Sequence, residues 1–156
     1  MSSIMSALDA DQIMQWLDQA HVPHYVCGEC HGIHLNDVQS MEGVLESRLF
    51  VEADCLMFFS ELEIRPSMVM QVVADLNRLN LTYTYLKVFV DLLDDSMPRL
   101  VIQDAIPHTA GLTYTQFQLY IENCIQATLA LIQECRQLSY LSGSIEPTSS
   151  PRSAMH

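Results

Sequence analysis

The side chains best suited to chemistry in this sequence are cysteines and histidines that lie close together in its first quarter. They form the pattern His24-x-x-Cys27-x-x-Cys30-His31-x-x-His34. Two thiolates separated by two residues on a tight turn commonly form half of a tetrahedral zinc site, and imidazole rings could complete the ligand set. The second cysteine pair that would make the zinc pattern specific is absent from the sequence.

The local sequence predicts a β-hairpin over residues 25–35. Gly28 and Glu29 fit a two-residue turn with glycine first, which would set the two cysteines opposite each other. Side chains alternate between the faces of a strand, so His31 and His34 would point in opposite directions. We therefore expect no stoichiometric metal ion. If a metal ion does bind, its candidate ligands are His24, Cys27, Cys30 and His34.

Two other chemistries fit the same cysteine pair. A redox dithiol is expected at the N-terminus of a helix, which lowers the pKa of a thiol, whereas the residues around Cys27 and Cys30 predict strands. The run Cys-x-x-Cys-His also matches c-type haem attachment, but the sequence shows no export signal and no obvious axial ligands. We interpret both thiols as small structural side chains. A metal- or redox-responsive sensor that is switched by the Cys27/Cys30 hairpin is the alternative.

No other group of residues predicts an active site. Cys55, Cys124 and Cys135 fall on apolar stripes and are expected in the core, whereas Asp94 and Asp95 occupy a turn that we expect to be solvated. The sequence contains no phosphate-binding loop, nucleophile elbow, His-Glu-x-x-His motif or dinucleotide fingerprint. We therefore predict no catalytic residues, no cofactor and no enzymatic activity.

The chain is strongly acidic. Its 156 residues include 19 Asp and Glu against 7 Lys and Arg, and no cation precedes Arg48. Proteins that bind phosphate backbones need clustered cations, because their affinity comes largely from counterion release, so we expect no direct contact with nucleic acid. The excess of acids favours solubility, and it would also steer the chain toward a basic or amphipathic protein partner.

Composition also bears on the expected location. Apolar residues make up 49% of the chain, as in globular proteins. The longest apolar runs are shorter than the ~20 residues that cross a bilayer, so no membrane contact is expected. The first residues lack the pattern of a signal peptide, and five cysteines then argue for a reducing compartment. We expect a cytoplasmic protein.

One long helix dominates the predicted structure. Apolar residues recur at three- and four-residue intervals from Thr113 to Leu138, which is typical of an amphipathic helix with one buried face. Thr113 is a good N-cap, and Gln116 stands where a capping box requires it. About 26 residues at a rise of 1.5 Å span roughly 39 Å, which is enough to back a small sheet.

Shorter elements precede this helix. Apolar spacing predicts helices over residues 9–20 and 66–80. Alternating patterns predict strands, beyond the hairpin, near residues 44–51, 55–62, 83–92 and 99–106. Because strands joined by short turns form antiparallel sheets, the order α-β-β-β-β-α-β-β-α predicts an α+β fold with helices packed on an antiparallel sheet. We expect residues 1–141 to form a single domain and residues 142–156 a mobile tail.

The predicted sheet carries apolar side chains on both faces. Leu56 and Val88 belong to the face under the helices, whereas other apolar residues of the same strands point the opposite way. Monomers rarely expose a contiguous apolar patch of this kind, and a two-fold contact would bury it. We therefore predict a homodimer. The candidate interface residues are Met57, Phe59, Tyr85 and Phe89.

Several short motifs, in their order and spacing, resemble one protein family. They are the Cys27–Cys30 hairpin with Ile33-His34-Leu35, the helix entry Glu63–Ser67, the strand Lys87–Asp91, the segment Met97–Val101 and the helix start Gly111–Phe117. Over roughly residues 8–140 the chain resembles the YbjN family of bacterial regulators, in its enterobacterial branch.

This resemblance implies a cytoplasmic, non-enzymatic protein that acts through protein contacts. It implies effects on exopolysaccharide production, motility, virulence and stress responses. It also implies dimerisation and a fold similar to class I type III secretion chaperones. The family has no catalytic motif, so the resemblance transfers no active-site residues, and it does not identify a partner.

Overall fold

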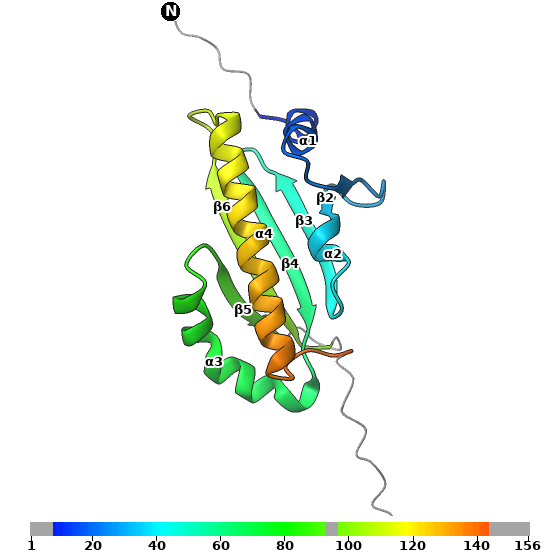
Figure 1. Cartoon of the computed structure of the whole chain (residues 1–156), viewed down its shortest axis with the longest axis vertical. Coiled ribbons are helices and arrows are strands. Elements are labelled where there is room, and N and C mark those ends of the chain that lie inside the picture. Colours follow the sequence, from blue (N-terminus) through cyan, green and yellow to red (C-terminus); the bar gives the residue numbers. More distant parts are fainter. Residues whose placement is uncertain (1–7, 93–96, 144–156) are drawn as a thin grey trace, which may run out of the picture.

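The computed structural model describes residues 8–92 and 97–143, which form one antiparallel sheet with its helices (Figure 1). In chain order the elements are α1 (Ala10–Gln19), β1 (His24–Tyr25), β2 (Ile33–Leu35), α2 (Asn36–Gln39), β3 (Val44–Val51), β4 (Cys55–Glu63), the 3-10 turn η1 (Pro66–Met68), α3 (Val69–Thr82), β5 (Lys87–Asp91), β6 (Arg99–Pro107) and α4 (Tyr114–Gln137). The predicted α+β class is confirmed. Asp94, Asp95 and the predicted tail beyond Gly143 lie outside the described residues.

The strands form a six-stranded sheet in the order β1-β2-β3-β4-β6-β5. Each neighbouring pair is antiparallel. The longest ladder joins β4 to β6, with register from Cys55↔Pro107 to Glu63↔Arg99. Because α3 carries the chain away from β4 before β5 forms, β5 becomes the edge strand and β6 fills the position between them.

The long helix α4 runs across one face of the sheet (Figure 1). Its start is the predicted capping box: the Gln116 N–H donates to Thr113 Oγ1 at 3.2 Å, and the Thr113 N–H donates to Gln116 Oε1 at 2.9 Å. The first helix begins in a related way, because the Gln12 N–H donates to the Asp9 carboxylate at 2.8 Å. None of the described helices is long and apolar enough to span a membrane.

In the described part of the chain, all four α-helices contribute to a core on one face of the sheet. Every second residue of β4 is buried there, including Leu56 and Phe58, in the same cluster as Phe117 of α4. The intervening β4 residues are half-buried and lie on the opposite face. We call this opposite side the outer face. Its central residues are Arg48, Phe50, Met57, Phe59, Val101 and Phe89.

Two local features differ from the sequence prediction. The helix α2 was not predicted, because four residues are too few to show a helical period; it buries Val38. The strand β5 begins at Lys87 rather than near Tyr83, because α3 continues to Thr82 and a turn must follow it. Tyr85 lies in that turn with 57% of its surface exposed, and it lines a hollow with Leu119 and Tyr120 of α4. It is therefore on the helix side of the sheet, so placing it on the outer face with Phe89 was wrong.

Candidate functional site

The segment between β1 and β2 is a longer loop than the sequence predicted. Only His24↔Leu35 and Tyr25↔His34 are paired between β1 and β2, which leaves residues 26–33 outside this ladder. The two-residue turn at Gly28 was therefore a wrong prediction. Gly32 instead packs against β3, since a Cβ added to it would meet Arg48 Cδ at 2.7 Å. The end of the loop therefore lies against β3, and the loop does not continue the pairing with β1.

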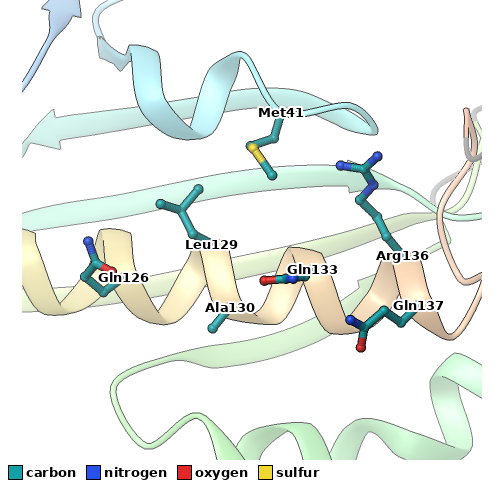
Figure 2. Close-up of a pocket in the computed structure, with 7 residues that line it drawn as sticks. All are labelled: Met41, Gln126, Leu129, Ala130, Gln133, Arg136 and Gln137. Atoms are coloured by element: carbon teal, nitrogen blue, oxygen red, sulfur yellow. The ribbon is translucent and has the colours of Figure 1, made fainter.

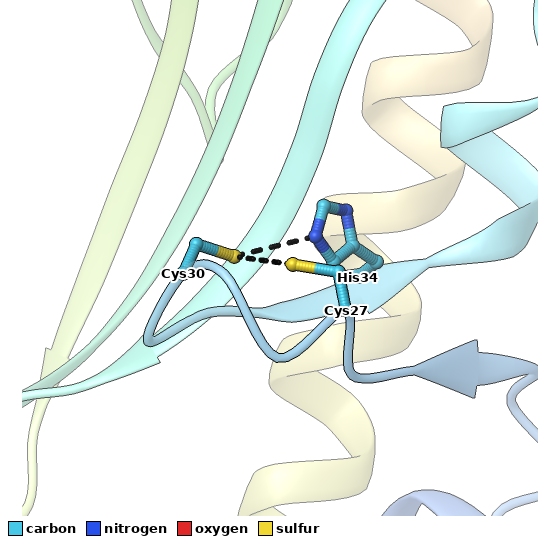
Figure 3. A group of neighbouring side chains, drawn as sticks. All are labelled: Cys27, Cys30 and His34. Atoms are coloured by element: carbon cyan, nitrogen blue, oxygen red, sulfur yellow. Dashed lines mark hydrogen bonds between the residues drawn. The ribbon is translucent and has the colours of Figure 1, made fainter.

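This loop brings three potential ligand side chains together (Figure 3). Cys27 Sγ lies 3.2 Å from Cys30 Sγ, and Cys30 Sγ lies 3.4 Å from His34 Nε2. The three ligand atoms all lie within 4.8 Å of one another. His31 lies in the loop and not on a strand, so the predicted alternation of His31 and His34 does not apply. His34, from β2, faces the thiols.

Gln39 of α2 determines which nitrogen of His34 carries the proton. Its Nε2 donates to the Leu45 carbonyl at 3.0 Å, and its Oε1 accepts the Ser47 N–H at 2.9 Å. A flipped amide would oppose like groups at both contacts, so the orientation is unambiguous. His34 Nδ1, 3.2 Å from the same Oε1, must therefore be the donor. In the neutral ring, the lone pair of Nε2 then faces Cys30.

A second side chain packs against the face of the His34 ring. The Tyr25 ring stacks on it with a centroid distance of 4.5 Å and an interplanar angle of 7°. Sequence reasoning missed both supporting residues, Gln39 and Tyr25. Gln39 is brought to His34 by the short helix α2, which has no periodic signature. Tyr25 is one residue from a candidate ligand, but the predicted turn would have paired it with Gly32, whereas the structure pairs it with His34.

The electrostatic setting of Cys27 differs from that of the cysteines elsewhere. The backbone N–H groups of Glu29 and Cys30, together with the Cys30 side chain, lower the pKa of the exposed Cys27 thiol. Burial raises the pKa of Cys124 and of Cys135, each to about 12. Both lie on the core side of α4, as predicted, whereas Cys55 is half-buried. Thiolate chemistry is thus favoured at the loop and disfavoured in the core.

His24 and His108 stand apart from this cluster. His24, a sequence candidate, directs Nδ1 to the Val22 carbonyl at 2.8 Å, and its Nε2 lies 3.6 Å from Asp18. His108 is buried, with Nε2 2.8 Å from the Glu52 carbonyl, and ties the end of β6 to the β3–β4 turn. Of the four candidate ligands, the structure brings Cys27, Cys30 and His34 together and leaves His24 outside.

One cross-strand row connects the cluster to the outer face. The register pairs His34 with Arg48, Arg48 with Phe59, and Phe59 with Gln103. Arg48 is paired with Glu46 and its guanidinium carbon lies 5.1 Å from the centroid of the Phe50 ring. Only Arg48 therefore separates His34 from Phe59 in this cross-strand row.

A separate shallow groove of about 760 Å³ lies between α4 and the segment after α2 (Figure 2). Side chains from α4 and from that segment line it: Met41, Gln126, Leu129, Ala130, Gln133, Arg136 and Gln137. Arg136, which supplies the cation of the lining, is 3.1 Å from Glu42. The lining offers amides and apolar groups without a nucleophile or a general base, so we do not regard the groove as an active site.

Comparison with known proteins places these features in a family. The family whose sequence pattern matches residues 9–137 is YbjN, described as "Putative bacterial sensory transduction regulator". The chain is 30% identical over 124 residues to "Uncharacterized protein YbjN" of Escherichia coli K12, covering 80% of this chain and 78% of that protein. The protein of the same name from Shigella flexneri matches with the same figures.

Solved structures agree with this assignment. The crystal structure of E. coli YbjN, titled "a putative transcription regulator", superposes with a TM-score of 0.81 at 28% identity, over 86% of this chain and 96% of that one. An uncharacterized protein from Methanothermobacter thermautotrophicus shares the fold alone, with a TM-score of 0.55 at 14% identity over 85% of this chain and 99% of that one. The capped helix α4, the six-stranded sheet and the family match together show that this chain belongs to the YbjN family.

Proposed function

We propose that this protein is a non-enzymatic cytoplasmic regulator that acts through contacts with other proteins. The observation that carries the proposal is the match of residues 9–137 to a family described as a regulator of sensory transduction. Its acidic charge, 19 acids against 7 bases, would favour a basic or amphipathic protein partner over nucleic acid or a membrane surface.

The outer face is the surface that we propose for protein contact. Phe50 and Phe59 meet edge to face with centroids 6.2 Å apart, and Met57 belongs to the same face. Phe89 is 37% exposed, and Lys87 Nζ lies 5.7 Å from the centroid of its ring. Aromatic, methionine and arginine side chains are enriched at protein interfaces relative to the rest of the surface.

The first partner on this face is a second copy of the chain. A two-fold contact places the same patch on both subunits, so the aromatic centres would cover each other. Charge supports this arrangement, because neighbouring rows of the face carry cations (Arg48, Lys87) and acids (Glu46, Glu61). A two-fold axis between these rows would bring opposite charges together across the interface.

Sedimentation velocity at micromolar concentration tests the dimer. We expect the wild type to sediment as a dimer. Phe59→Glu and Phe89→Glu should both sediment as monomers, because a dimer of either variant would bury a carboxylate without a partner. Tyr85→Glu is the matched control: it places the same charge on an exposed aromatic position outside the outer face and should leave the dimer intact. A monomeric wild type would refute the dimer, and a dimer that resists both changes would refute this interface.

The family resemblance extends the proposal to the regulated processes, which are exopolysaccharide production, motility, virulence and stress responses. In a strain from which the gene is deleted, complementation with the wild type should restore exopolysaccharide yield and swimming. Complementation with Phe59→Glu should fail, and Tyr85→Glu should succeed. Affinity purification of the two variants from native cells, compared by mass spectrometry, would identify partners that depend on the outer face.

A second candidate function is that of a sensor whose input is the Cys27/Cys30 hairpin. The observation that favours it is the convergence of Cys27, Cys30 and His34 on a loop that contacts Arg48 of the outer face. The double variant Cys27→Ser/Cys30→Ser decides between these functions. An unchanged regulatory phenotype would remove the sensor and leave the contact regulator in place.

A further inference from the structure

We propose that Cys27, Cys30 and His34 bind one Zn²⁺ ion, with two thiolates and one imidazole as ligands. The site does not depend on the regulatory function proposed above, because metal binding and partner binding are measured separately. It also revises the expectation from sequence that the chain holds no stoichiometric metal. That expectation rested on the incomplete ligand set and on strand alternation, which would send His31 and His34 to opposite faces. In the structure His31 lies in the loop, and His34 Nε2 lies 3.4 Å from Cys30 Sγ.

The distances between the ligand atoms suit one zinc ion. Tetrahedral zinc with Zn–S of about 2.3 Å and Zn–N of about 2.0–2.1 Å holds two sulfurs about 3.8 Å apart and a sulfur and a nitrogen about 3.6 Å apart. The corresponding separations here are 3.2 Å for the two sulfurs and 3.4 Å for Cys30 and His34, and the third pair, Cys27 and His34, lies within 4.8 Å. Because Cys27 lies on an exposed loop, the small expansion that the ion requires meets little resistance.

The groups around the ligands are those that a zinc site uses. Metal-bound histidine usually donates its second ring N–H to an acceptor, which directs the lone pair of the other nitrogen at the metal. Gln39 Oε1 performs this role for His34 at 3.2 Å, and Gln39 is itself anchored to the backbone of Leu45 and Ser47. Binding would release the proton of each thiol that ligates zinc, and the backbone N–H groups near Cys27 stabilise the resulting thiolate.

A reversible Cys27–Cys30 disulfide is the competing explanation for the short distance between the sulfurs. A disulfide needs only the two cysteines at about 2.05 Å. It leaves unexplained why the Nε2 lone pair of His34 faces Cys30, and why Gln39 and Tyr25 hold the ring in that orientation. Two sulfurs and one neutral imidazole form a ligand set that suits zinc, with a fourth position open to water.

Metal titration of the reduced full-length protein tests the site. The protein is stripped with a chelator and desalted, and Zn²⁺ is then added in competition with a chromophoric chelator. We expect one Zn²⁺ per chain. Co²⁺ replaces zinc as a spectroscopic probe and should show the thiolate-to-metal absorption of two sulfur ligands. Absence of Zn²⁺ uptake by the reduced wild type would overturn the proposal, and so would Co²⁺ uptake without thiolate absorption.

Single variants locate the ion. Cys27→Ser, Cys30→Ser and His34→Ala should each lower zinc affinity by more than the roughly 10–100-fold that loss of a supporting partner causes. Cys55→Ser and His31→Ala are matched controls of the same residue types outside the cluster and should bind like the wild type. Equal losses in the controls, or full uptake by the three cluster variants, would overturn the site. Circular dichroism of each variant confirms that it is folded.

Variants of Gln39, which orients His34, give a second test that a nonspecific thiol site would not pass. Gln39→Ala should lower zinc affinity about 10–100-fold. Gln39→Glu keeps an acceptor for His34 Nδ1 but loses the donor to the Leu45 carbonyl, so it should bind zinc more tightly than Gln39→Ala and less tightly than the wild type. Mass spectrometry of air-exposed protein supplies the last comparison. A Cys27–Cys30 disulfide that forms in air, combined with no zinc uptake after reduction, would replace the metal site by a redox pair.

Discussion

At the scale of single residues, position decides what the same side chain can do. The thiols of Cys124 and Cys135 are held neutral because burial raises the pKa of each to about 12. The Cys27 thiol has its pKa lowered by backbone N–H groups and lies beside a second thiol and an imidazole. Burial, followed by Asp54, also raises the pKa of Cys55. Thiolate chemistry is therefore favoured in the loop before β2, although the sequence distributes cysteines over the whole chain.

A buried hydroxyl pair gives a prediction at this scale. Ser47 Oγ and Ser60 Oγ are 2.9 Å apart on adjacent strands, and both residues are fully buried. Ser47→Ala or Ser60→Ala alone should lower the free energy of unfolding by about 1–3 kcal/mol, because the remaining hydroxyl loses its partner.

The double variant at these positions is the informative comparison. Replacing both hydroxyls removes the unsatisfied group, so Ser47→Ala/Ser60→Ala should be close to the wild type in stability. Urea unfolding of the four proteins measures the cycle. A double variant whose loss equals the sum of the single losses would show that the two hydroxyls do not act as a pair.

At the scale of elements, the edge strand β5 is held by a side chain of α3. Asn80 Oδ1 accepts the Val88 N–H and Asn80 Nδ2 donates to the Val88 carbonyl, both at 2.9 Å. These backbone groups are the ones that an edge strand would otherwise leave open to pairing with another chain. Asn80 thus fastens α3 to β5 and protects this edge of the sheet.

Asn80→Ala should destabilise the protein by about 1–2 kcal/mol, because both backbone groups of Val88 lose their partner. Asn77→Ala is the matched control, since Asn77 is an exposed residue of the same helix and its change should lie within about 0.5 kcal/mol of zero. Urea unfolding measures both. Amide exchange at Val88 should also accelerate in Asn80→Ala; unchanged protection of that amide would contradict the role of Asn80 as a clamp.

At the scale of the whole molecule, an ionic cluster joins α3 to α4. Arg78 contacts Asp75 at 2.7 Å and Glu134 at 2.6 Å, while Tyr140 donates to Asp75 at 2.9 Å and Tyr83 donates to Glu134. The Arg78 hydrogen bond lowers the pKa of Asp75. The Tyr83 hydrogen bond, followed by Arg78, lowers the pKa of Glu134. Segments distant in sequence are therefore coupled through two carboxylates.

This cluster predicts acid sensitivity of a definite sign. The pKa values of Asp75 and Glu134 in the folded protein lie below the ordinary 3.8 and 4.5, so the unfolded chain binds protons first as pH falls. Their contribution to stability is complete above the ordinary values and is lost as pH drops through the lowered ones. Unfolding free energy measured from pH 7 to pH 3 should fall more steeply in the wild type than in Arg78→Met.

The control for this prediction is Arg136→Met. It removes a pair with Glu42 in which the side chains are 38% and 48% exposed, so the expected effect on stability is small. An acid decline of Arg78→Met as steep as that of the wild type would show that Asp75 and Glu134 do not carry the effect.

What the sequence by itself determined is local in origin. The capping box of Thr113 and Gln116 and the N-cap of Asp9 join residues three positions apart, so their spacing in the sequence is sufficient to predict them. The alternation that separates Leu56 from Met57 likewise follows from the strand period. These patterns, together with the family motifs, were enough for the fold class and the family.

What only the tertiary structure decided depends on partners distant along the chain or on elements without a period. The loop that holds Cys27 packs through Gly32 against Arg48 of β3, and the orientation of His34 depends on Gln39 in a four-residue helix. Tyr85 does not lie on the outer face, because α3 continues to Thr82, beyond the end that its apolar spacing indicated, and Tyr85 falls in the turn that follows. In each case the deciding contact is non-local, and a periodic pattern reports only which face of an element is buried, not what packs against it.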